Sequence, residues 1–475
     1  MSSAAPWRGR RIHLVGVGGA GMSAYARAAA ALGADVSGSD AAAGPSTESL
    51  IADGVLRDLH VGHARENVPP GDDVELFYSS AVPEDNPERL AARERGLRES
   101  PRAELLGELS ALRRTIAVAG THGKTTTASM LVYALRGAGV ELSWLIGGSA
   151  GAGLGNAHWS DGEWLVVEAD ESDRSMLSLE VEIAVLTNVE LDHHATFASL
   201  IELREAFREF LARASAGIVI WRRAELLELV PPAARTGEQG RARAATADSG
   251  ARAGARGEDG GPVVVPFEAD ELDLGAHGVR MRWRGHEVAL RVYGAHNALN
   301  ALAALEAARL AGADEGRAIA GLASFEGAGR RFELLGTAHG ARIYDDYAHH
   351  PSEVVATLRA ARTLAPGRLV AVFQPHLYSR TAALAGELGR ALALADVIAV
   401  LEVYAARERA EDHPGVSGLR VAEAAADAAG GRTVYWLPTF ADAEPVLRAQ
   451  LRAGDLCVVM GAGDIDALGR ALVRA

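Results

Sequence analysis

Short apolar runs alternate with longer segments of helical periodicity along nearly the whole chain. Runs such as RIHLVGV, TIAVAG and RLVAVFQP have the composition of buried strands, whereas segments such as TTTASMLVYALRGAG have that of helices. Regular alternation of the two predicts an α/β fold built on parallel sheets. At 475 residues the chain is too long for a single core, and the strand–helix pattern restarts twice. The pattern therefore predicts three domains, over residues 1–108, 109–326 and 327–475.

Composition narrows the class of protein. The net charge of −14 argues against a nucleic-acid scaffold, which needs a basic stripe. A single cysteine, Cys457, excludes an intramolecular disulfide framework and fits a reducing compartment. No apolar stretch reaches the roughly 18 residues of a membrane span. The basic and apolar start WRGRRIHLVGVGGAG is better interpreted as a strand and a glycine turn than as a signal peptide. We therefore predict a cytoplasmic protein that binds neither nucleic acid nor membrane.

A first glycine cluster follows the first predicted strand. Gly16, Gly18 and Gly21 have the spacing G-x-G-x-x-G before a predicted helix, and Asp40 ends the next strand. Glycines at these positions let the backbone approach a diphosphate, and the helix N-terminus adds positive potential. The pattern predicts a site for NAD or for a nucleoside-diphosphate sugar, with a purely structural turn as the alternative.

The stretch VAGTHGKTTTASM resembles a phosphate-binding loop that has lost two residues. Only two residues separate Gly120 from Gly123, whereas the common form has four between its glycines. The groups that hold phosphates are still present. They are the backbone N–H groups, the Lys124 ammonium for the β- and γ-oxygens and the Thr125 hydroxyl for Mg²⁺. We therefore predict that this loop binds ATP or GTP.

Acidic and polar side chains follow the ends of later predicted strands. The segment EADESD (168–173) comes after one apolar strand, and TNVELDH (187–193) comes after its neighbour. Their carboxylates and imidazole suit Mg²⁺ beside triphosphate oxygens, although a solvated loop of acids has the same composition. Four further polar segments are each ambiguous when taken alone: GAHNALNA (294–301), GRRFE (329–333), DDYAHHP (345–351) and FQPHLYSRT (373–381).

Taken in order, these segments resemble the Mur ligase family over essentially the whole chain. The resemblance rests on HLVGVGGAGMS, VSGSD, SSAV…NPE, AGTHGKTTT, EADESD, TNVELDH, GAHNALNA, GAGRRFELLG, DDYAHHPSEV, FQPHLYSRT and GAGDI. It implies a Rossmann-like first domain that binds the UDP moiety and a central ATP-binding domain that carries the phosphate loop. A Rossmann-like C-terminal domain would close over the reaction and supply the amino-acid site.

The resemblance also implies an activity, namely ATP-driven amide formation in the synthesis of peptidoglycan precursors. With ATP and Mg²⁺, the γ-phosphoryl group would pass to the lactyl carboxylate of UDP-N-acetylmuramate. L-Alanine would then attack the acyl phosphate, so that ADP and phosphate are formed. The chain is expected to act as a monomer or a dimer.

Site residues follow from the same resemblance. For ATP they are Gly120, Thr121, His122, Gly123, Lys124, Thr125 and Thr126 in the loop, with His296, Asn297, Asn300, Arg331 and Asp346. For the UDP-sugar they are Gly18, Gly19, Ala20, Asp40, His63 and Ser80. For L-alanine they are Asp346, Tyr347, His349 and Arg380, and for Mg²⁺ Thr125, Glu168 and His193. Of all these, Lys124, His193, Arg331, His349 and Arg380 are expected to take part in catalysis.

Three features depart from the family pattern. Leu377 stands where some members carry Arg, so the alanine carboxylate is expected to depend more on Arg380 and a histidine. His194 and Ala195 stand where an Asp commonly follows, which leaves the surroundings of the metal open. Residues 233–261 are rich in Gly, Ala and Arg without a period, and predict a flexible surface insertion with no family counterpart.

Three alternatives remain at this point. A murein-peptide ligase adds a recycled tripeptide to the same nucleotide sugar, but generally lacks the intact G-x-G-G-x-G of the first loop. An NAD-dependent dehydrogenase would explain Gly16 to Asp40 but gives no purpose to the second loop or the third domain. A non-enzymatic UDP-sugar sensor would not need the acids of segments 168–173 and 187–193.

Overall fold

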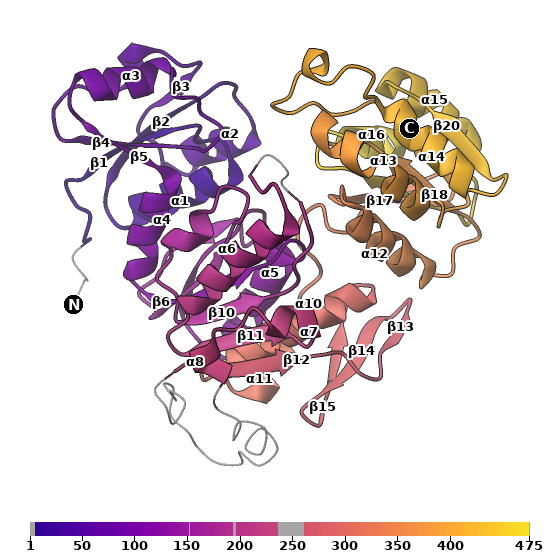
Figure 1. Cartoon of the computed structure of the whole chain (residues 1–475), viewed down its shortest axis with the longest axis horizontal. Helices are drawn as coiled ribbons and strands as arrows, with labels where there is room; N and C mark the ends of the chain where they lie inside the picture. The colour runs from indigo at the N-terminus through magenta and orange to yellow at the C-terminus, as the bar shows by residue number, and fades with distance from the viewer. Residues whose placement is uncertain (1–4, 152, 193–195, 236–260, 475) are drawn as a thin grey trace. The chain divides into compact units, whose positions relative to one another are not determined.

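The computed structural model describes residues 5–151, 153–192, 196–235 and 261–474 (Figure 1). These residues form four sheets and divide into two compact units. The N-terminal unit is Met1–Glu268 with Leu299–Ser324, and the C-terminal unit is Ala269–Ala298 with Phe325–Ala475. The α/β class with parallel sheets, predicted from the alternation of apolar and helical segments, is confirmed.

The first sheet of the N-terminal unit has five parallel strands in the order β3-β2-β1-β4-β5. Its elements are β1 (Arg11–Val15), α1 (Ala20–Ala31), β2 (Asp35–Asp40), α2 (Pro45–Ala52), β3 (Leu59–Val61), η1 (Arg65–Asn67), β4 (Val74–Tyr78), α3 (Pro87–Glu94), β5 (Arg98–Pro101) and α4 (Arg102–Ala111). The strand order reverses between β1 and β4, and ligands of open parallel sheets bind in the crevice at such a reversal. The glycine cluster 16–21 follows β1 and the serines 79–80 follow β4, so both segments reach this point.

The central sheet has the order β12-β11-β10-β6-β9-β7-β8, with β8 antiparallel to β7 and the other pairs parallel. Its strands are β6 (Arg114–Ala119), β7 (Leu142–Leu145), β8 (Ala157–His158), β9 (Trp164–Glu168), β10 (Ile183–Leu186), β11 (Gly217–Trp221) and β12 (Val263–Phe267). Its helices are α5 (Lys124–Gly137), η2 (Ser175–Ser178), α6 (Leu200–Ala212), α7 (Ala224–Leu227), α8 (Pro232–Arg235), α10 (Ala295–Leu310) and α11 (Glu315–Leu322). Because β6 lies between β9 and β10, the loops after these three strands leave the sheet at the same edge.

Burial explains why these strands show no polar alternation. Strands β6, β9 and β10 are buried along almost their whole length, as expected for parallel strands covered on both faces. Helix α11 packs on α5 so closely that a Cβ on Gly137 would lie 2.3 Å from the Gly321 Cα. Helix α10 belongs to both units, because they divide between Ala298 and Leu299.

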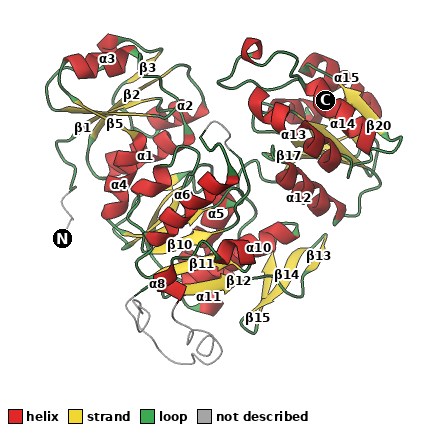
Figure 2. Ribbon diagram, viewed as in Figure 1, coloured by secondary structure: helices red, strands yellow, loops and turns green. Residues whose placement is uncertain are grey.

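The C-terminal unit begins with a small antiparallel sheet, β13 (Asp273–Gly275), β14 (Gly278–Trp283) and β15 (His286–Leu290), visible as a meander in Figure 2. A six-stranded sheet follows in the order β16-β17-β21-β18-β19-β20, with β16 antiparallel to β17. Its strands are β16 (Glu333–Ala338), β17 (Ala341–Asp346), β18 (Leu369–Phe373), β19 (Val397–Val400), β20 (Thr433–Trp436) and β21 (Leu456–Met460). Its helices are α12 (Pro351–Arg362), α13 (Tyr378–Leu392), η3 (Ala410–Asp412), α14 (Gly418–Ala428), α15 (Phe440–Gln450) and α16 (Asp466–Val473).

Both faces of this six-stranded sheet are apolar and covered. Leu369, Ala371 and Phe373 of β18 join one buried cluster, and Val370 and Val372 join another. Alternate residues of a strand point to opposite faces, so β18 feeds two cores. Across the described ranges, no helix is long and apolar enough to cross a bilayer.

Two predictions about the course of the chain are left open by the structure. The limit at residue 108 falls inside α4, and the limits at 108 and 327 stay predictions. Residues 236–260, the bulk of the predicted insertion 233–261, lie outside the described residues.

Candidate active site

Two glycines shape the shortened phosphate loop between β6 and α5. Gly120 has a φ of 132° and Gly123 one of 82°, both in the region that favours glycine. A Cβ on Gly120 would lie 2.1 Å from the Thr187 hydroxyl oxygen, and one on Gly123 would lie 2.6 Å from Oδ1 of Asn300. Both positions therefore require glycine on steric as well as conformational grounds. The structure also places the predicted ATP residue Asn300 directly against the loop.

Asn188, which follows β10, forms hydrogen bonds with Thr121 and His122, the two residues between the glycines. Its backbone carbonyl accepts the Thr121 N–H at 3.1 Å, and its side-chain oxygen accepts the His122 N–H at 2.9 Å. Its amide donates to the His122 carbonyl at 2.9 Å. The sequence predicted that backbone N–H groups of Gly120–Thr125 hold phosphate, and in the structure those of Thr121 and His122 donate to Asn188. Phosphate would instead meet the N–H groups of the first turn of α5, which have no acceptor within the helix.

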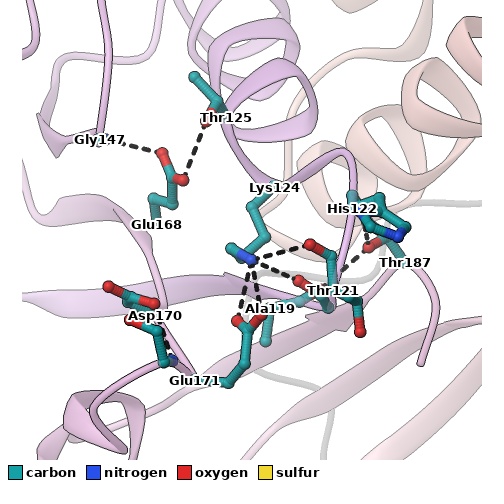
Figure 3. Close-up of polar contacts among 12 residues, drawn as sticks. Ala119, Thr121, His122, Lys124, Thr125, Gly147, Glu168, Asp170, Glu171 and Thr187 are labelled. Carbon is teal, nitrogen blue, oxygen red and sulfur yellow. Dashed lines mark hydrogen bonds and ion pairs between the residues drawn. The ribbon is translucent and has the colours of Figure 1, made fainter. Parts of the chain in front are cut away.

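Lys124 begins α5, and its ammonium group turns back into the loop (Figure 3). Nζ donates to the carbonyls of Gly120 at 2.7 Å and Thr121 at 3.1 Å, and lies 2.9 Å from Oε2 of Glu171. The Lys124 side chain is 13% exposed and that of Glu171 is 0% exposed. Burial lowers the pKa of Lys124, but the charges of Glu171 and Asp170 outweigh it and raise the pKa above its ordinary 10.5. The ammonium stays charged at neutral pH, and Glu171 is its partner rather than an acid beside the metal.

Two of the three predicted magnesium ligands, Thr125 and Glu168, are among the described residues, and they are hydrogen-bonded to each other (Figure 3). The Thr125 hydroxyl donates to one carboxylate oxygen of Glu168 at 2.9 Å, and the Gly147 N–H donates to the other at 2.7 Å. Burial raises the pKa of Glu168, so a cation beside it would offset the cost of its charge. The Thr125 hydroxyl at the start of α5 and the Glu168 carboxylate at the end of β9 are ligands that Mg²⁺ takes together with phosphates and water, so the donor set fits this ion. The third predicted ligand, His193, lies outside the described residues, as do His194 and Ala195.

Arg102 of α4 pairs with Asp170, an acid that the sequence placed near the metal, and with Asp173 of the same segment. It donates to Asp170 at 2.8 Å and to Asp173 at 2.6 Å. Burial raises the pKa of Asp170, but Arg102 and Lys124 lower it to about 2. A Cβ on Gly21 would lie 2.6 Å from Nη1 of Arg102, so the third glycine of the first cluster makes room for this guanidinium. No periodicity or motif in the sequence marks Arg102, and only the fold reveals it.

The residues predicted for the UDP-sugar all lie at the carboxyl end of the first sheet, on four neighbouring strands. Asp40 is the last residue of β2, and the others follow the C-terminal ends of β1, β3 and β4: Gly18, Gly19, Ala20, His63 and Ser80. The Gly18 N–H donates to the Asp40 carboxylate at 2.8 Å, and a Cβ on Gly18 would lie 2.9 Å from the same oxygen. Asp40 therefore fixes the glycine turn. The sequence did not single out Asn156, whose amide donates to the Ala20 carbonyl and to the Ser23 hydroxyl, each at 3.0 Å.

Three of the predicted ATP residues meet inside the C-terminal unit. Burial lowers the pKa of His296 to about 4, with a further contribution from the charge of Arg331, so its ring is neutral at pH 7. Burial raises the pKa of Asp346 to about 6 although Arg331 opposes the shift, and two backbone N–H groups donate to its carboxylate at 2.8 Å. Arg331 lies 3.7 Å from Glu353. Asn297, in the first turn of α10, donates to a backbone carbonyl at 2.8 Å. The phosphate loop belongs to the N-terminal unit.

The residues predicted for alanine also lie together in the C-terminal unit. Nδ1 of His349 is 2.9 Å from the Tyr347 carbonyl, and Nη1 of Arg380 is 3.0 Å from Nδ1 of His376. The rings of His349 and His376 are 5.9 Å apart, so His376, absent from the predicted set, stands between His349 and Arg380. Arg380 is only 4% exposed. Leu377 is buried at the start of α13 with a φ of 68°, and it brings no charge to this group.

Comparison with known proteins connects the two units to one family. The chain matches the Mur ligase family catalytic domain over residues 11–114, the Mur ligase middle domain over 118–308 and the Mur ligase glutamate ligase domain over 330–463. The UDP-N-acetylmuramate–L-alanine ligase of Saccharopolyspora erythraea is 44% identical over 97% of this chain and 92% of its own length. The protein of the same name from Kineococcus radiotolerans is 45% identical over 97% and 94%.

Solved structures agree with these relatives. The UDP-N-acetylmuramate-alanine ligase of Thermotoga maritima has a TM-score of 0.78 at 25% identity, with 98% of each chain covered. A murein peptide ligase from Psychrobacter arcticus shares the fold, with a TM-score of 0.65 at 24% identity and the same coverage. Three family domains in order and near-complete coverage of relatives above 40% identity show that this chain belongs to the Mur ligase family.

Proposed function

We propose that this chain is the ligase that joins L-alanine to the lactyl carboxylate of UDP-N-acetylmuramate and converts ATP to ADP and phosphate. The observation that carries the proposal is the identity of 44% and 45%, over nearly the whole chain, with two ligases of that name. The phosphate loop and its buried, charged lysine support the ATP half of the reaction. The amino-acid group of the C-terminal unit supports the other half.

Carboxylate activation needs help from the protein because two anions must approach each other. The γ-phosphoryl group passes to the lactyl carboxylate, and catalysis of such a transfer consists mostly of positioning and charge stabilisation. Lys124 keeps its charge despite burial, so it can stabilise the phosphoryl group during transfer. The N-terminus of α5 adds backbone N–H groups that point toward the same phosphates.

Thr125 and Glu168 would hold Mg²⁺, which supplies charge neutralisation at the β- and γ-phosphate oxygens when it is bound. We assign Arg331 to the γ-phosphate, and Asn300, His296 and Asn297 to adenine and ribose. A neutral His296 suits contact with a nucleoside, since a charged ring would be costly in its buried position.

Amide formation requires the alanine amine to lose a proton before or as it attacks the acyl phosphate. Nδ1 of His349 donates to the Tyr347 carbonyl at 2.9 Å, which orients the ring, and we assign His349 to this proton transfer. We assign the alanine carboxylate to Arg380. His376 accepts from Arg380 through Nδ1 and fixes the guanidinium in place.

The proposal is tested by measuring phosphate release with both substrates and with each omitted. We expect release only when UDP-N-acetylmuramate and L-alanine are both present, with glycine used about 10–200-fold less efficiently, since it lacks the methyl group. In a second arm, L-alanine and the tripeptide L-Ala-γ-D-Glu-diaminopimelate compete in one tube, and the products are weighed by mass spectrometry. A predominant tripeptide product would replace the proposal with the murein-peptide ligase.

A further inference from the structure

The carboxylate of Glu88 is buried in the domain of the first sheet. It accepts hydrogen bonds from several polar side chains, and one of them is His63, which was predicted for the UDP-sugar. Glu88 lies in the first turn of α3, where the Asn86 side chain caps the helix by accepting the Glu88 N–H at 2.9 Å. The Glu88 side chain is 0% exposed, and burial by itself raises its pKa. Hydrogen bonds from His13, Ser39 and His63 outweigh burial and lower the pKa to about 2. Glu88 is therefore ionised, and the surrounding donors are organised around its charge.

Each oxygen of Glu88 has two donors. Oε2 accepts from Nε2 of His13 at 2.8 Å and from the Ser39 hydroxyl at 2.7 Å. Oε1 accepts from Nδ1 of His63 at 2.9 Å and from the Asn67 amide at 3.1 Å. The one hydroxyl hydrogen of Ser39 is committed to Glu88, so its oxygen, 3.2 Å from Nδ1 of His63, can only accept there. Both neighbours of Nδ1 are acceptors, and Nδ1 of His63 must carry the ring hydrogen.

This tautomer decides what His63 offers to a ligand. With its Nδ1–H turned to Glu88, the remaining ring nitrogen, Nε2, accepts hydrogen bonds in the neutral ring. The His63 side chain is 23% exposed, whereas His13, on the other oxygen of Glu88, is 0% exposed. The Gly62 N–H donates to the Asp40 carbonyl at 2.8 Å, which holds the start of this loop beside the end of β2. The partly exposed His63 thus follows a residue that is hydrogen-bonded to Asp40, which fixes the glycine turn.

We propose that Glu88 is a positioning residue of the nucleotide-sugar site, which holds His63 so that Nε2 accepts from an N–H or O–H group of the uridine moiety. The identity of the ligand rests on the proposed function. Partners that orient a ligand-binding histidine matter elsewhere: their mutation typically costs about 10–100-fold in affinity or activity at metal sites. Glu88 belongs to the NPE segment (86–88), so this segment would orient a ligand-binding side chain without taking part in the reaction itself.

The test is the pattern of KM values in Glu88→Gln, which keeps the shape of the side chain but removes its charge. We expect the KM for UDP-N-acetylmuramate to rise about 10–100-fold, while kcat and the KM for ATP change less than about twofold. His63→Ala should produce the same pattern. Because Glu88 acts through His63, the double variant should be no worse than His63→Ala alone. Glu99→Gln is the matched control, since Glu99 lies on β5 of the same sheet and pairs with Arg89 and Arg93; its KM values should stay at the wild-type level.

Several results would overturn the proposal. They are an equal rise in the KM for ATP, a lowered melting temperature with unchanged KM values, or an effect of Glu88→Gln that adds to that of His63→Ala. If Glu88→Gln does not fold, Glu88→Asp carries the same test, because it keeps the charge and shortens the reach by one methylene. If the wild type does not turn over this substrate pair, the proposed function fails by itself. The affinities of wild type and Glu88→Gln for UDP, measured by calorimetry, then still decide the role of Glu88, and equal affinities would refute it.

Discussion

Replacing Glu171 by glutamine should destabilise the free protein much more than the nucleotide-bound protein. Glu171 is fully buried and lies 2.9 Å from the Lys124 ammonium, which the substitution would leave buried beside a neutral amide. Removing one partner of a buried ion pair typically costs about 3–5 kcal/mol. The carbonyls of Gly120 and Thr121 still accept hydrogen bonds from Nζ. We therefore expect the free energy of unfolding to fall by about 3 kcal/mol, the lower end of this range.

A bound triphosphate changes this result because it brings negative charge to the same ammonium. At about 2–4 °C per kcal/mol for domains of this size, the variant should melt about 6–12 °C below wild type without nucleotide. Saturating Mg²⁺ and a non-hydrolysable ATP analogue should close at least half of that gap. The pKa of Lys124 is raised above 10.5, so the contribution of its ammonium charge is fully present below about pH 10.5 and is lost as the pH rises through the raised pKa. Melting curves at neutral pH therefore measure it in full.

The control is a carboxylate that pairs at the other end of the central sheet. Glu182 accepts from Arg114 at 2.8 Å just before β10, and neither side chain belongs to the phosphate loop. Glu182→Gln should lower the melting temperature by an amount that the analogue leaves unchanged. The reasoning is refuted if Glu171→Gln melts with wild type in the absence of nucleotide, or if its deficit is the same with and without the analogue.

Three further outcomes follow from the described geometry. Lys124→Ala should lower kcat by at least about 10³-fold, with ADP and phosphate still the products; stoichiometric AMP would contradict an acyl phosphate. Gly120→Ala should abolish nucleotide binding in calorimetry, because its Cβ would lie 2.1 Å from the Thr187 hydroxyl oxygen, whereas Gly139→Ala, also at positive φ but with no neighbour within 4 Å, should retain it. His296 has a pKa of about 4 instead of 6.5, so the folded state binds fewer protons and loses stability as the pH falls from 6.5 to 4. His296→Asn should therefore show a smaller drop in melting temperature between pH 7 and pH 4.5 than wild type, and equal drops would argue against it.

Periodicity and glycine spacing were sufficient to predict the strands and helices that present the phosphate loop. The apolar run TIAVAG and the segment TTTASMLVYALRGAG became β6 and α5 almost to the residue, because burial on both faces leaves an unambiguous pattern. Both glycines of the shortened loop could also be identified from the sequence. They are two residues apart, and the second one directly precedes Lys124.

Periodicity and glycine spacing could not predict which charged side chains pair with each other. Asp170, Glu171 and Asp173 follow one strand in a single short segment, yet Glu171 pairs with Lys124 and the two aspartates pair with Arg102. Arg102 lies 68 positions from Asp170, and a single sequence carries no signal for so distant a pair. The network of Glu88 depends in the same way on strand order, because β1, β2 and β3 must lie side by side before His13, Ser39 and His63 can share one carboxylate.

The fastening of the shortened loop by Asn188 has a consequence for how ATP is captured. A loop that is mobile before binding must lose conformational entropy when it closes on phosphate, and this loss subtracts from affinity. Here the N–H groups of Thr121 and His122 already have acceptors in the free protein, at 3.1 Å and 2.9 Å. The shortened loop is thus held in place by hydrogen bonds before nucleotide binds. Its backbone amides are expected to exchange slowly with solvent deuterium before any nucleotide arrives.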